Sequence, residues 1–145
     1  MGPLDGVRVL DLTKVLAGPF ATQMLGDFGA DVIKIERPGA GDDTRAFGPP
    51  FVDGESTYFL SINRSKRSVA LNLKSAAAVD LVKKIAERSD ILIENFRPGS
   101  LKKLGLDYET LHARFPRLIY VSISGFGATG PDALRPGYDL AVQGL

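Results

Sequence analysis

The stretch VRVLDLTKVLAGPFATQMLGDFGADVIKIE, residues 7–36, has the pattern of a strand, a helix and a second strand. Its two ends, Val7–Leu12 and Asp31–Glu36, are rich in Val, Ile and Leu without clean alternation, which is typical of parallel strands covered on both faces. Between them, Pro19 suits a first helical turn and Gly29 a helix end. An apolar stripe, typical of a helix that packs on a sheet, comprises Phe20, Met24, Leu25 and Phe28.

The same alternation continues along the chain. Further strands are predicted at Ser68–Leu73, Asp90–Asn95 and Leu118–Ser124, and helices capped by Ser75 and Asp107 separate them. The long Gly- and Pro-rich stretch 38–66 holds at most one short element, around residues 56–62. Strands that alternate with helices predict an α/β fold, with a mostly parallel, doubly wound sheet and helices on both faces.

Length and composition are those of one globular domain, because 44% of the 145 residues are hydrophobic and 24% are charged. The formal net charge of +1 gives no reason to expect nucleic acid or an anionic membrane as a partner. No apolar run approaches the roughly 20 residues of a membrane span, and the first residues lack a signal-peptide pattern. We therefore expect a cytoplasmic protein. Without Cys, thiolate nucleophiles and Cys-based metal sites are excluded for these residues, and a catalytic triad would need the single histidine, His112.

Four of the predicted strands are followed by a cation, at Lys14, Arg37, Lys74 and Arg97. Open parallel sheets bind ligands beyond the carboxyl ends of their strands, so these side chains would share that edge of the sheet, here called the rim. Helix starts beside the rim add N–H groups that favour phosphate. Each cation alone could be a solvated loop residue, but the set favours a ligand with several phosphates, such as coenzyme A.

The stretch GFGATG, residues 125–130, has the G-x-G-x-x-G spacing of a dinucleotide-binding loop. That fingerprint opens the first strand–helix–strand unit and leads into a helix, whereas this one follows the fifth predicted strand and precedes Pro131 and Pro136. We therefore interpret it as a turn that lines the rim. A nicotinamide-dependent oxidoreductase is kept as the least favoured alternative.

Three other features carry weaker signals. The basic run Asn63–Arg67 lacks interleaved aromatic residues, so we predict a solvated or phosphate-adjacent loop instead of a nucleic-acid site. Asp42 and Asp43 lie in a Gly-rich stretch, where such residues more often cap or turn the chain than share a proton. His112 has no companion histidine, which favours a structural or solvent-exposed role. We assign no catalytic residue and no metal ligand within the chain.

Longer segments resemble the class III coenzyme A transferases. They are PLDGVRVLDLTKVLAGPFATQMLGDFGADVIKIERPGAGDDTR, STYFLSINRSKRSVALNLK, ENFRPGSLKKLGL, PRLIYVSISGFGATGP and GYDLAVQG, in family order and across essentially the whole chain. The resemblance implies a Rossmann-like large domain that binds CoA, of which residues 1–145 would be the amino-terminal part. It also implies a second, smaller domain and an interlinked homodimer. The chain stops inside the apolar run Tyr138–Leu145, as expected for part of a longer protein.

The resemblance also implies which residues contact CoA, the substrate that the family binds as a thioester without a prosthetic group. They are Leu16, Ala17, Arg37, Leu71, Asn72, Leu73, Lys74, Asn95, Phe96, Arg97, Lys103, Pro136, Gly137, Tyr138 and Asp139. Three of the four rim cations belong to this set. Lys14 does not, and we therefore consider it a weaker candidate for a CoA contact.

The family reaction, as the resemblance implies it, moves CoA from an acyl-CoA donor to a free carboxylic acid. An aspartate attacks the thioester, the released CoA thiolate then forms an aspartyl-CoA thioester, and the acceptor carboxylate is acylated in turn. That aspartate would lie beyond Leu145, so the chain alone is expected to be inactive. Leu16 stands where formyl-CoA transferases carry Gln, which disfavours formyl and oxalate exchange.

Two alternatives remain beside the transferase. In the related 2-methylacyl-CoA racemases a catalytic His stands at the position of Tyr138, and a tyrosine is a poor base near neutral pH, which disfavours a racemase. A non-catalytic CoA-binding fragment is the other alternative. Within the transferases, the first 45 residues look most like members that act on dicarboxylates such as succinate and glutarate.

Overall fold

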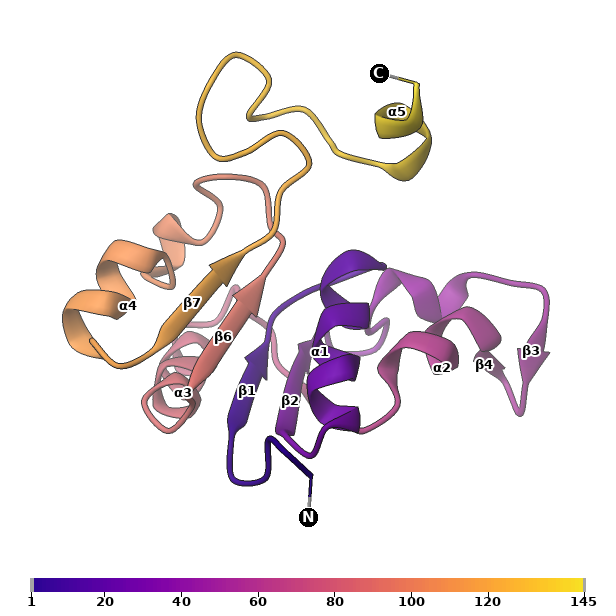
Figure 1. Cartoon of the computed structure of the whole chain (residues 1–145), viewed down its shortest axis with the longest axis horizontal. Helices are drawn as coiled ribbons and strands as arrows, with labels where there is room; N and C mark the ends of the chain where they lie inside the picture. The colour runs from indigo at the N-terminus through magenta and orange to yellow at the C-terminus, as the bar shows by residue number, and fades with distance from the viewer. Residues whose placement is uncertain (1, 145) are drawn as a thin grey trace.

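A parallel sheet forms the centre of the molecule in the computed structural model, which describes residues 2–144 apart from the side chain of Asp139 (Figure 1). Among these residues the sheet has five strands in the order β5-β2-β1-β6-β7. Their bounds are β1 (Arg8–Asp11), β2 (Asp31–Glu36), β5 (Lys66–Ala70), β6 (Ile91–Glu94) and β7 (Ile119–Ser122). Each neighbouring pair is parallel, which confirms the predicted sheet.

The connections between the strands contain the helices. These are α1 (Ala17–Asp27), α2 (Thr57–Asn63), α3 (Ala76–Ala86), α4 (Tyr108–Arg114) and the short α5 (Asp139–Gln143). Two 3-10 turns, η1 (Asp43–Ala46) and η2 (Lys102–Leu104), and a small antiparallel pair of β3 (Phe51–Val52) and β4 (Glu55–Ser56) complete the elements. The element expected around residues 56–62 corresponds to α2, but η1, β3 and β4 also lie within 38–66, so the expectation of at most one element there is wrong.

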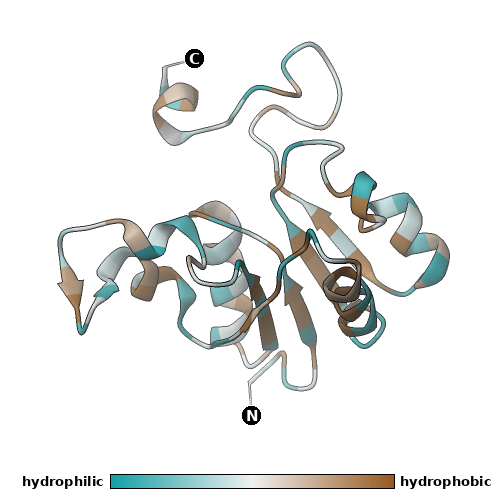
Figure 2. Ribbon diagram, turned by 180° about the vertical axis from the view of Figure 1, so that it is seen from behind, coloured by the Kyte–Doolittle hydropathy of each residue, from teal (hydrophilic) through white to brown (hydrophobic). Residues whose placement is uncertain are grey.

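Helices cover both faces of the sheet, as predicted. On one face Leu10, Ile35 and Leu92 pack with Val82 of α3 and Leu111 of α4. On the other face Val9, Val32 and Ile93 pack with partly buried side chains that include Leu25 of α1. Figure 2 shows the central strands as a hydrophobic layer between these helices. The alternation of Val9 and Leu10 between two faces explains why the strands have no polar side.

Helix α1 differs from the sequence-based expectation. Phe20, Met24 and Phe28 of the apolar stripe are about half exposed, at 50, 46 and 51%, whereas Thr22 and Gln23 are buried. The reason lies under the helix, where the Asp11 carboxylate of β1 accepts a hydrogen bond from Thr22 Oγ1 at 2.6 Å. The helix therefore turns its polar face towards a buried charge, and most of its stripe lies at the surface.

A second difference concerns the start of β5. The strand was predicted at Ser68–Leu73 but spans Lys66–Ala70. The interpretation of Asn63–Arg67 as a solvated or phosphate-adjacent loop is therefore wrong for Lys66 and Arg67, whereas Arg64 lies in a turn and its side chain is 61% exposed. Lys66 is almost fully buried against Asp11, and Arg67 pairs with Asp31 of the neighbouring strand at 2.6 Å. Carboxylates of other strands neutralise both cations, because Asp11 lies on β1, two strands away from β5, and Asp31 lies on the adjacent β2.

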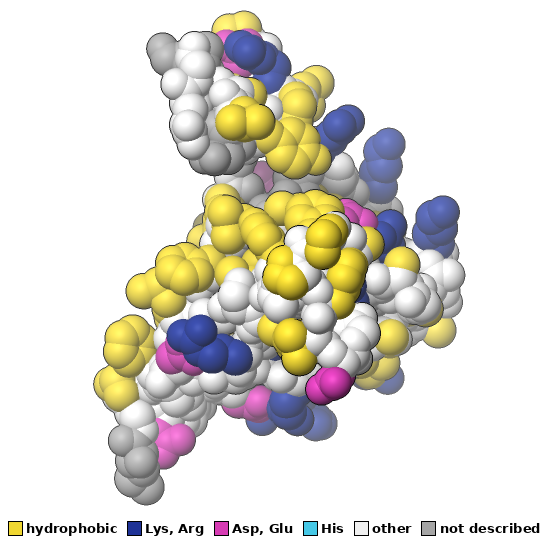
Figure 3. Space-filling model, turned by 90° about the vertical axis from the view of Figure 1, so that its right-hand side faces the viewer, with side chains coloured by type: hydrophobic (Ala, Val, Ile, Leu, Met, Phe, Trp, Pro, Cys, Tyr) yellow, Lys and Arg dark blue, Asp and Glu magenta, His cyan; other side chains and the backbone are white. Residues whose placement is uncertain are grey.

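The outer surface beside α2 is partly apolar. Phe47, Phe51, Val52 and Leu60 are each between 44 and 53% exposed. Figure 3, which views the molecule from the side of α2 and β3–β4, shows hydrophobic side chains gathered on this face. Within the described residues, no helix is both long enough and apolar enough to cross a membrane.

Candidate functional site

The strand order indicates that a ligand crevice belongs between β1 and β6 at the rim. Chain connections run in opposite directions from these two central strands, towards β2 and β5 on one side and towards β7 on the other. Such a reversal opens a crevice at the carboxyl ends, which is where open α/β sheets bind ligands. The loops after β1, β2, β5 and β6 therefore all belong to the candidate site. After β7 the chain runs past this edge to α5 (Figure 1).

The loop after β1, residues 12–16, is here called the β1–α1 loop, and a buried carboxylate anchors its beginning. Asp11 is fully buried and accepts hydrogen bonds from Thr13 N at 2.8 Å and Thr13 Oγ1 at 2.5 Å, in addition to the one from Thr22. The Lys66 ammonium lies 3.2 Å from the same carboxylate. Burial lowers the pKa of Lys66 to about 8, although the negative charge of Asp11 opposes this shift.

A second buried ion pair lies under the same loop. Lys34 Nζ is 3.0 Å from Asp42 Oδ2, both side chains are at most 2% exposed, and the ammonium also donates to Thr13 O at 2.8 Å. Burial alone would raise the pKa of Asp42, but the charge of Lys34 and hydrogen bonds from Thr44 outweigh it and lower the pKa. The carboxylate form of Asp42 is therefore favoured by the buried ammonium beside it. As predicted, it caps a turn: its side chain accepts from Thr44 N at the start of η1.

The far side of the β1–α1 loop is held from β6. Asn95 Oδ1 accepts from Lys14 N at 2.9 Å, and Asn95 Nδ2 donates to Lys14 O at 2.8 Å. Sequence reasoning assigned Asn95 to CoA, and the structure shows that its amide already binds the loop backbone. The Lys14 ammonium lies 5.5 Å from the centre of the Phe96 ring, a cation–π arrangement at the rim.

Helix α1 begins at this loop with free donors. Leu16 occupies the N-cap position and is 44% exposed, and no side chain caps the helix. The first N–H groups of an uncapped helix attract negative charge. Gly18 allows α1 to pack closely against Thr13 of the loop, because a Cβ at this position would lie 2.3 Å from Thr13 Cβ. Leu16 and Ala17, which are expected to contact CoA, therefore lie at the N-terminus of α1, beyond the carboxyl end of β1.

The loop after β2 carries Arg37, whose guanidinium is about half exposed. It lies 2.5 Å from Asp43 Oδ1, so one rim cation is partly neutralised by its neighbour in the same loop. Glu36 anchors this loop from below: Arg45 donates to it through Nε and Nη2, both at 2.8 Å. Gly41 permits this arrangement, since a Cβ there would lie 2.6 Å from Glu36 Oε2.

The stability of the loop after β2 depends on pH through the charge of Glu36. Burial alone would raise the pKa of Glu36. Hydrogen bonds from Arg45, Ser68 and the Asp42 backbone have a larger effect in the opposite direction and lower the pKa to about 2. Since this value lies below the ordinary 4.5, the stabilisation is complete above pH 4.5 and is lost as the pH falls towards 2. We expect Glu36→Gln to cost roughly 3 kcal/mol of local stability at pH 7 and much less near pH 2. Hydrogen exchange of the β2 and β5 amides against pH measures this difference.

The exposed carboxylate Glu87 supplies the control for that measurement. Glu87→Gln is expected to leave β2 and β5 exchange unchanged at every pH. A Glu36→Gln effect that stays constant from pH 7 to pH 2 would contradict the charge argument.

The loop after β5 opens onto a basic depression of about 320 Å³ at the N-terminus of α3. Three lysines line it, namely Lys74, Lys83 and Lys103. Ser75 takes the predicted N-cap position but makes no side-chain capping bond, so the first N–H groups of α3 keep no side-chain acceptor. Three ammonium groups beside an uncapped helix of 11 residues form an environment suited to phosphate.

Other expected contacts take differing positions. Leu71, Leu73 and Phe96 are half-buried and pack against the core on the α3 side, so they offer only part of their surface to a ligand. Asn72 shapes the turn before α3, because its Oδ1 accepts from Lys74 N at 3.1 Å. Arg97 is exposed in the loop after β6.

The carboxyl-terminal segment joins the glycine-rich stretch. Pro136, Gly137 and Tyr138 precede α5 and are exposed, whereas the side chain of Asp139 lies outside the described residues. A Cβ on Gly125 would lie 2.4 Å from Gly137 Cα, so Gly125 serves a close approach of two backbones. The GFGATG stretch contains no helix start, which agrees with its interpretation as a turn and not as a dinucleotide loop.

Sequence reasoning missed Lys34, Lys66 and Lys83. Lys83 lies seven residues after Ala76 and therefore on the same face as the start of α3. Lys34 had a signal of its own, since a single Lys in the apolar run of β2 requires a buried partner. His112 stacks on the Tyr108 ring at 5.1 Å, in line with the predicted structural role.

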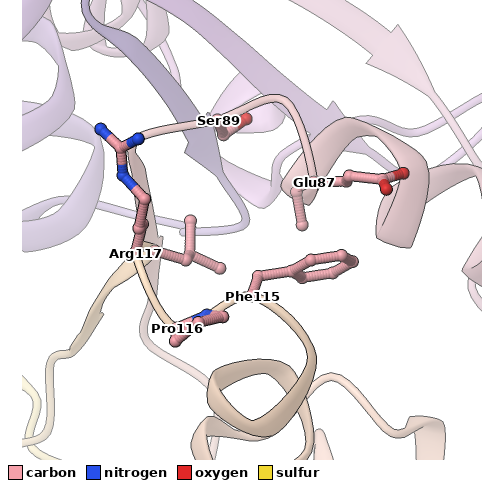
Figure 4. Close-up of a pocket in the computed structure, with 7 residues that line it drawn as sticks. Glu87, Ser89, Phe115, Pro116 and Arg117 are labelled. Atoms are coloured by element: carbon pink, nitrogen blue, oxygen red, sulfur yellow. The ribbon is translucent and has the colours of Figure 1, made fainter.

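A second depression, of about 230 Å³, lies at the opposite edge of the sheet, where α3 ends and β7 begins. Figure 4 shows Phe115 and Pro116 along it, with the side chains of Arg117 and Glu87 pointing in different directions. It brings no reactive groups together. Within residues 2–144, no cluster of three His, Asp or Glu side chains is arranged to hold a metal ion.

Comparisons with known proteins agree with this geometry. The succinyl-CoA:glutarate CoA-transferase of Mus musculus is 60% identical over 145 residues, which cover 100% of this chain and 33% of that protein. The acetyl-CoA:oxalate CoA-transferase of Acetobacter aceti is 52% identical, and the match covers 99% of this chain and 37% of that protein. A crystal structure of a CAIB/BAIF family protein from Brucella suis superposes with a TM-score of 0.94 at 51% identity, over 99% of this chain and 39% of that one.

The chain thus spans about a third of the length of the curated relatives it matches. The model of the family described as CoA-transferase family III matches residues 4–145. Taken with the parallel sheet and the basic rim, this match shows that the chain belongs to CoA-transferase family III.

Proposed function

We propose that the protein of which this chain is part transfers CoA from an acyl-CoA donor to a free carboxylic acid, and that residues 1–145 provide much of its CoA site. The observation that carries the proposal is the basic depression formed by Lys74, Lys83 and Lys103 beside the uncapped start of α3. CoA has a pyrophosphate and a 3′-phosphate, and clustered ammonium groups with free N–H donors bind such groups.

The remaining parts of the rim suit the rest of the molecule. From the depression, the pantetheine arm would run along the carboxyl ends of the strands towards the crevice between β1 and β6. There the N–H groups at the start of α1 can stabilise the negative charge that develops on a thioester oxygen during acyl transfer. A covalent aspartyl-CoA step would use a carboxylate outside this chain, as would closure of the site, and we propose a homodimer as the working assembly.

A dicarboxylate is the acceptor that we propose. The names of two relatives refer to glutarate and oxalate, both dicarboxylic acids, so the comparison does not by itself exclude oxalate. Leu16 lies at the entrance to α1 and is 44% exposed, an apolar side chain at the point where the acyl group would be placed. An apolar contact favours the methylene groups of glutarate over oxalate, which has none.

The complete protein, incubated with succinyl-CoA and glutarate, is expected to form glutaryl-CoA and succinate in equal amounts without net loss of thioester. Mass spectrometry of the CoA esters follows the reaction, and oxalate and a monocarboxylate serve as competing acceptors. With a 2-methylacyl-CoA as a second substrate, inversion at the α-carbon without transfer would favour the racemase alternative. Tight binding of CoA with neither reaction would favour a binding module.

A further inference from the structure

We propose that Asp42, held by the buried ammonium of Lys34, is the positioning residue that fixes the β1–α1 loop in the conformation that receives the acyl-CoA. This inference rests on the proposed function, because it concerns the same crevice between β1 and β6. Asp42 does not reach the ligand itself and acts through Val15. Neither the sequence patterns nor the family resemblance assigned it this role.

The loop needs such a support because of Val15. Its φ is 66°, in the left-handed region that a β-branched residue rarely adopts. A residue in this conformation persists only when its surroundings determine it. Val15 immediately precedes Leu16, the N-cap of α1, so its backbone sets the direction from which the chain enters the helix and exposes the first N–H groups.

Asp42 supplies the contact that holds this conformation. Its Oδ1 accepts from Val15 N at 3.3 Å and, at the same time, from Thr44 N and Thr44 Oγ1 at 3.1 and 2.9 Å. The loop after β2 is thereby tied to the loop after β1, 27 residues away in sequence. Two parts of the rim, the Arg37 side and the α1 side, are set in place together.

Lys34 fixes the carboxylate from below. Its ammonium lies 3.0 Å from Asp42 Oδ2 and donates to Thr13 O, so one cation contacts both the Asp42 side chain and the β1–α1 loop. Asn95 holds Lys14 from the β6 side through two hydrogen bonds. Thr13 and Lys14, which precede Val15, are thus restrained, and among the described residues Asp42 is the only side chain that accepts from the Val15 N–H.

The test uses the complete protein, with CoA as the ligand. If Asp42→Asn lowers the fraction of molecules with a competent loop to about a tenth, the apparent Kd for CoA rises about tenfold, because apparent affinity scales with that fraction. In the ligand-free protein, hydrogen exchange at residues 13–18 should become faster. Asp42→Glu, which keeps a carboxylate for Lys34 but displaces Oδ1, should produce the same two effects if Asp42→Asn does not fold.

Val15→Gly provides the decisive second change. Glycine adopts a φ of 66° without a Cβ penalty, so this variant needs less support from residue 42. In the Asp42→Asn background, Val15→Gly is expected to recover most of the lost CoA affinity although it cannot restore the ion pair. Val32→Ala, a core truncation in β2 whose cluster contains no residue of the loop or of the basic depression, controls for general destabilisation and should leave the Kd unchanged.

The outcomes separate this inference from the proposed function. Faster loop exchange and a raised Kd, both reversed by Val15→Gly, support it. Unchanged loop exchange in both Asp42 variants, or a Kd that Val15→Gly does not improve, overturns it. If the wild-type protein does not bind CoA, the proposed function fails, and the exchange data alone then decide whether Asp42 fixes the loop.

Discussion

Replacement of Asp11 by Ala is expected to lower the local free energy of unfolding by about 3–5 kcal/mol in the part of the sheet formed by β1, β2 and β5. This is the range for breaking a buried ion pair. The Lys66 ammonium, whose side chain is 2% exposed, would lose its carboxylate and be left with the neutral acceptors Pro19 O and Asn63 Oδ1. The Thr13 and Thr22 hydroxyls would lose an acceptor as well. Because the whole protein is larger than this chain, the suitable measurement is native-state hydrogen exchange of the β1 and β5 amides.

Asp31→Ala is the matched control for that variant. Asp31 also lies on a sheet strand and pairs with two arginines, Arg8 and Arg67, but its side chain is 35% exposed. Water compensates for the loss of such a pair, so the expected cost is about 1 kcal/mol or less. Equal effects of the two substitutions would show that the buried charge of Asp11 is not what organises α1 and the loop.

The second large effect concerns ligand binding. Lys74→Ala combined with Lys103→Ala is expected to weaken CoA binding roughly 100-fold, if each lysine makes one charge-assisted contact of about 1.5 kcal/mol. The slope of log Kd against log salt should also decrease, because fewer phosphate charges are neutralised. Isothermal titration of the complete protein with CoA at two salt concentrations measures both quantities.

Lys84→Ala controls for the loss of positive charge. Lys84 lies beside Lys83 on α3 but does not line the depression, so CoA affinity should remain within about twofold of the wild type. If Lys84→Ala and the double variant weaken binding equally, the lysines attract CoA only as part of the overall charge. The phosphates would then not sit in the depression.

Much of the fold was predictable because it depends on local patterns. Apolar runs without alternation predicted a parallel sheet covered on both faces, and the sheet places residues such as Ala17 and Lys74 after their strands at one edge. The rim followed from this topology alone. What the pattern could not give was the state of each cation there, such as the pairing of Arg37 with Asp43.

The buried pair of Asp11 and Lys66 lay beyond sequence reasoning for a physical reason. Asp11 and Lys66 are 55 positions apart, and only the pairing of β2 with both β1 and β5 brings them together. Without that pairing, Lys66 looks like a loop cation. The half-exposed Phe20 and Met24 follow from the same buried charge, because α1 turns Thr22 towards Asp11.

The most direct test of the account is a crystal structure of the complete protein with CoA. We predict that phosphate oxygens lie within hydrogen-bonding distance of Lys74 and Lys103, and that the thiol reaches the start of α1 between β1 and β6. A CoA molecule bound elsewhere, with this depression empty, would contradict the proposed site.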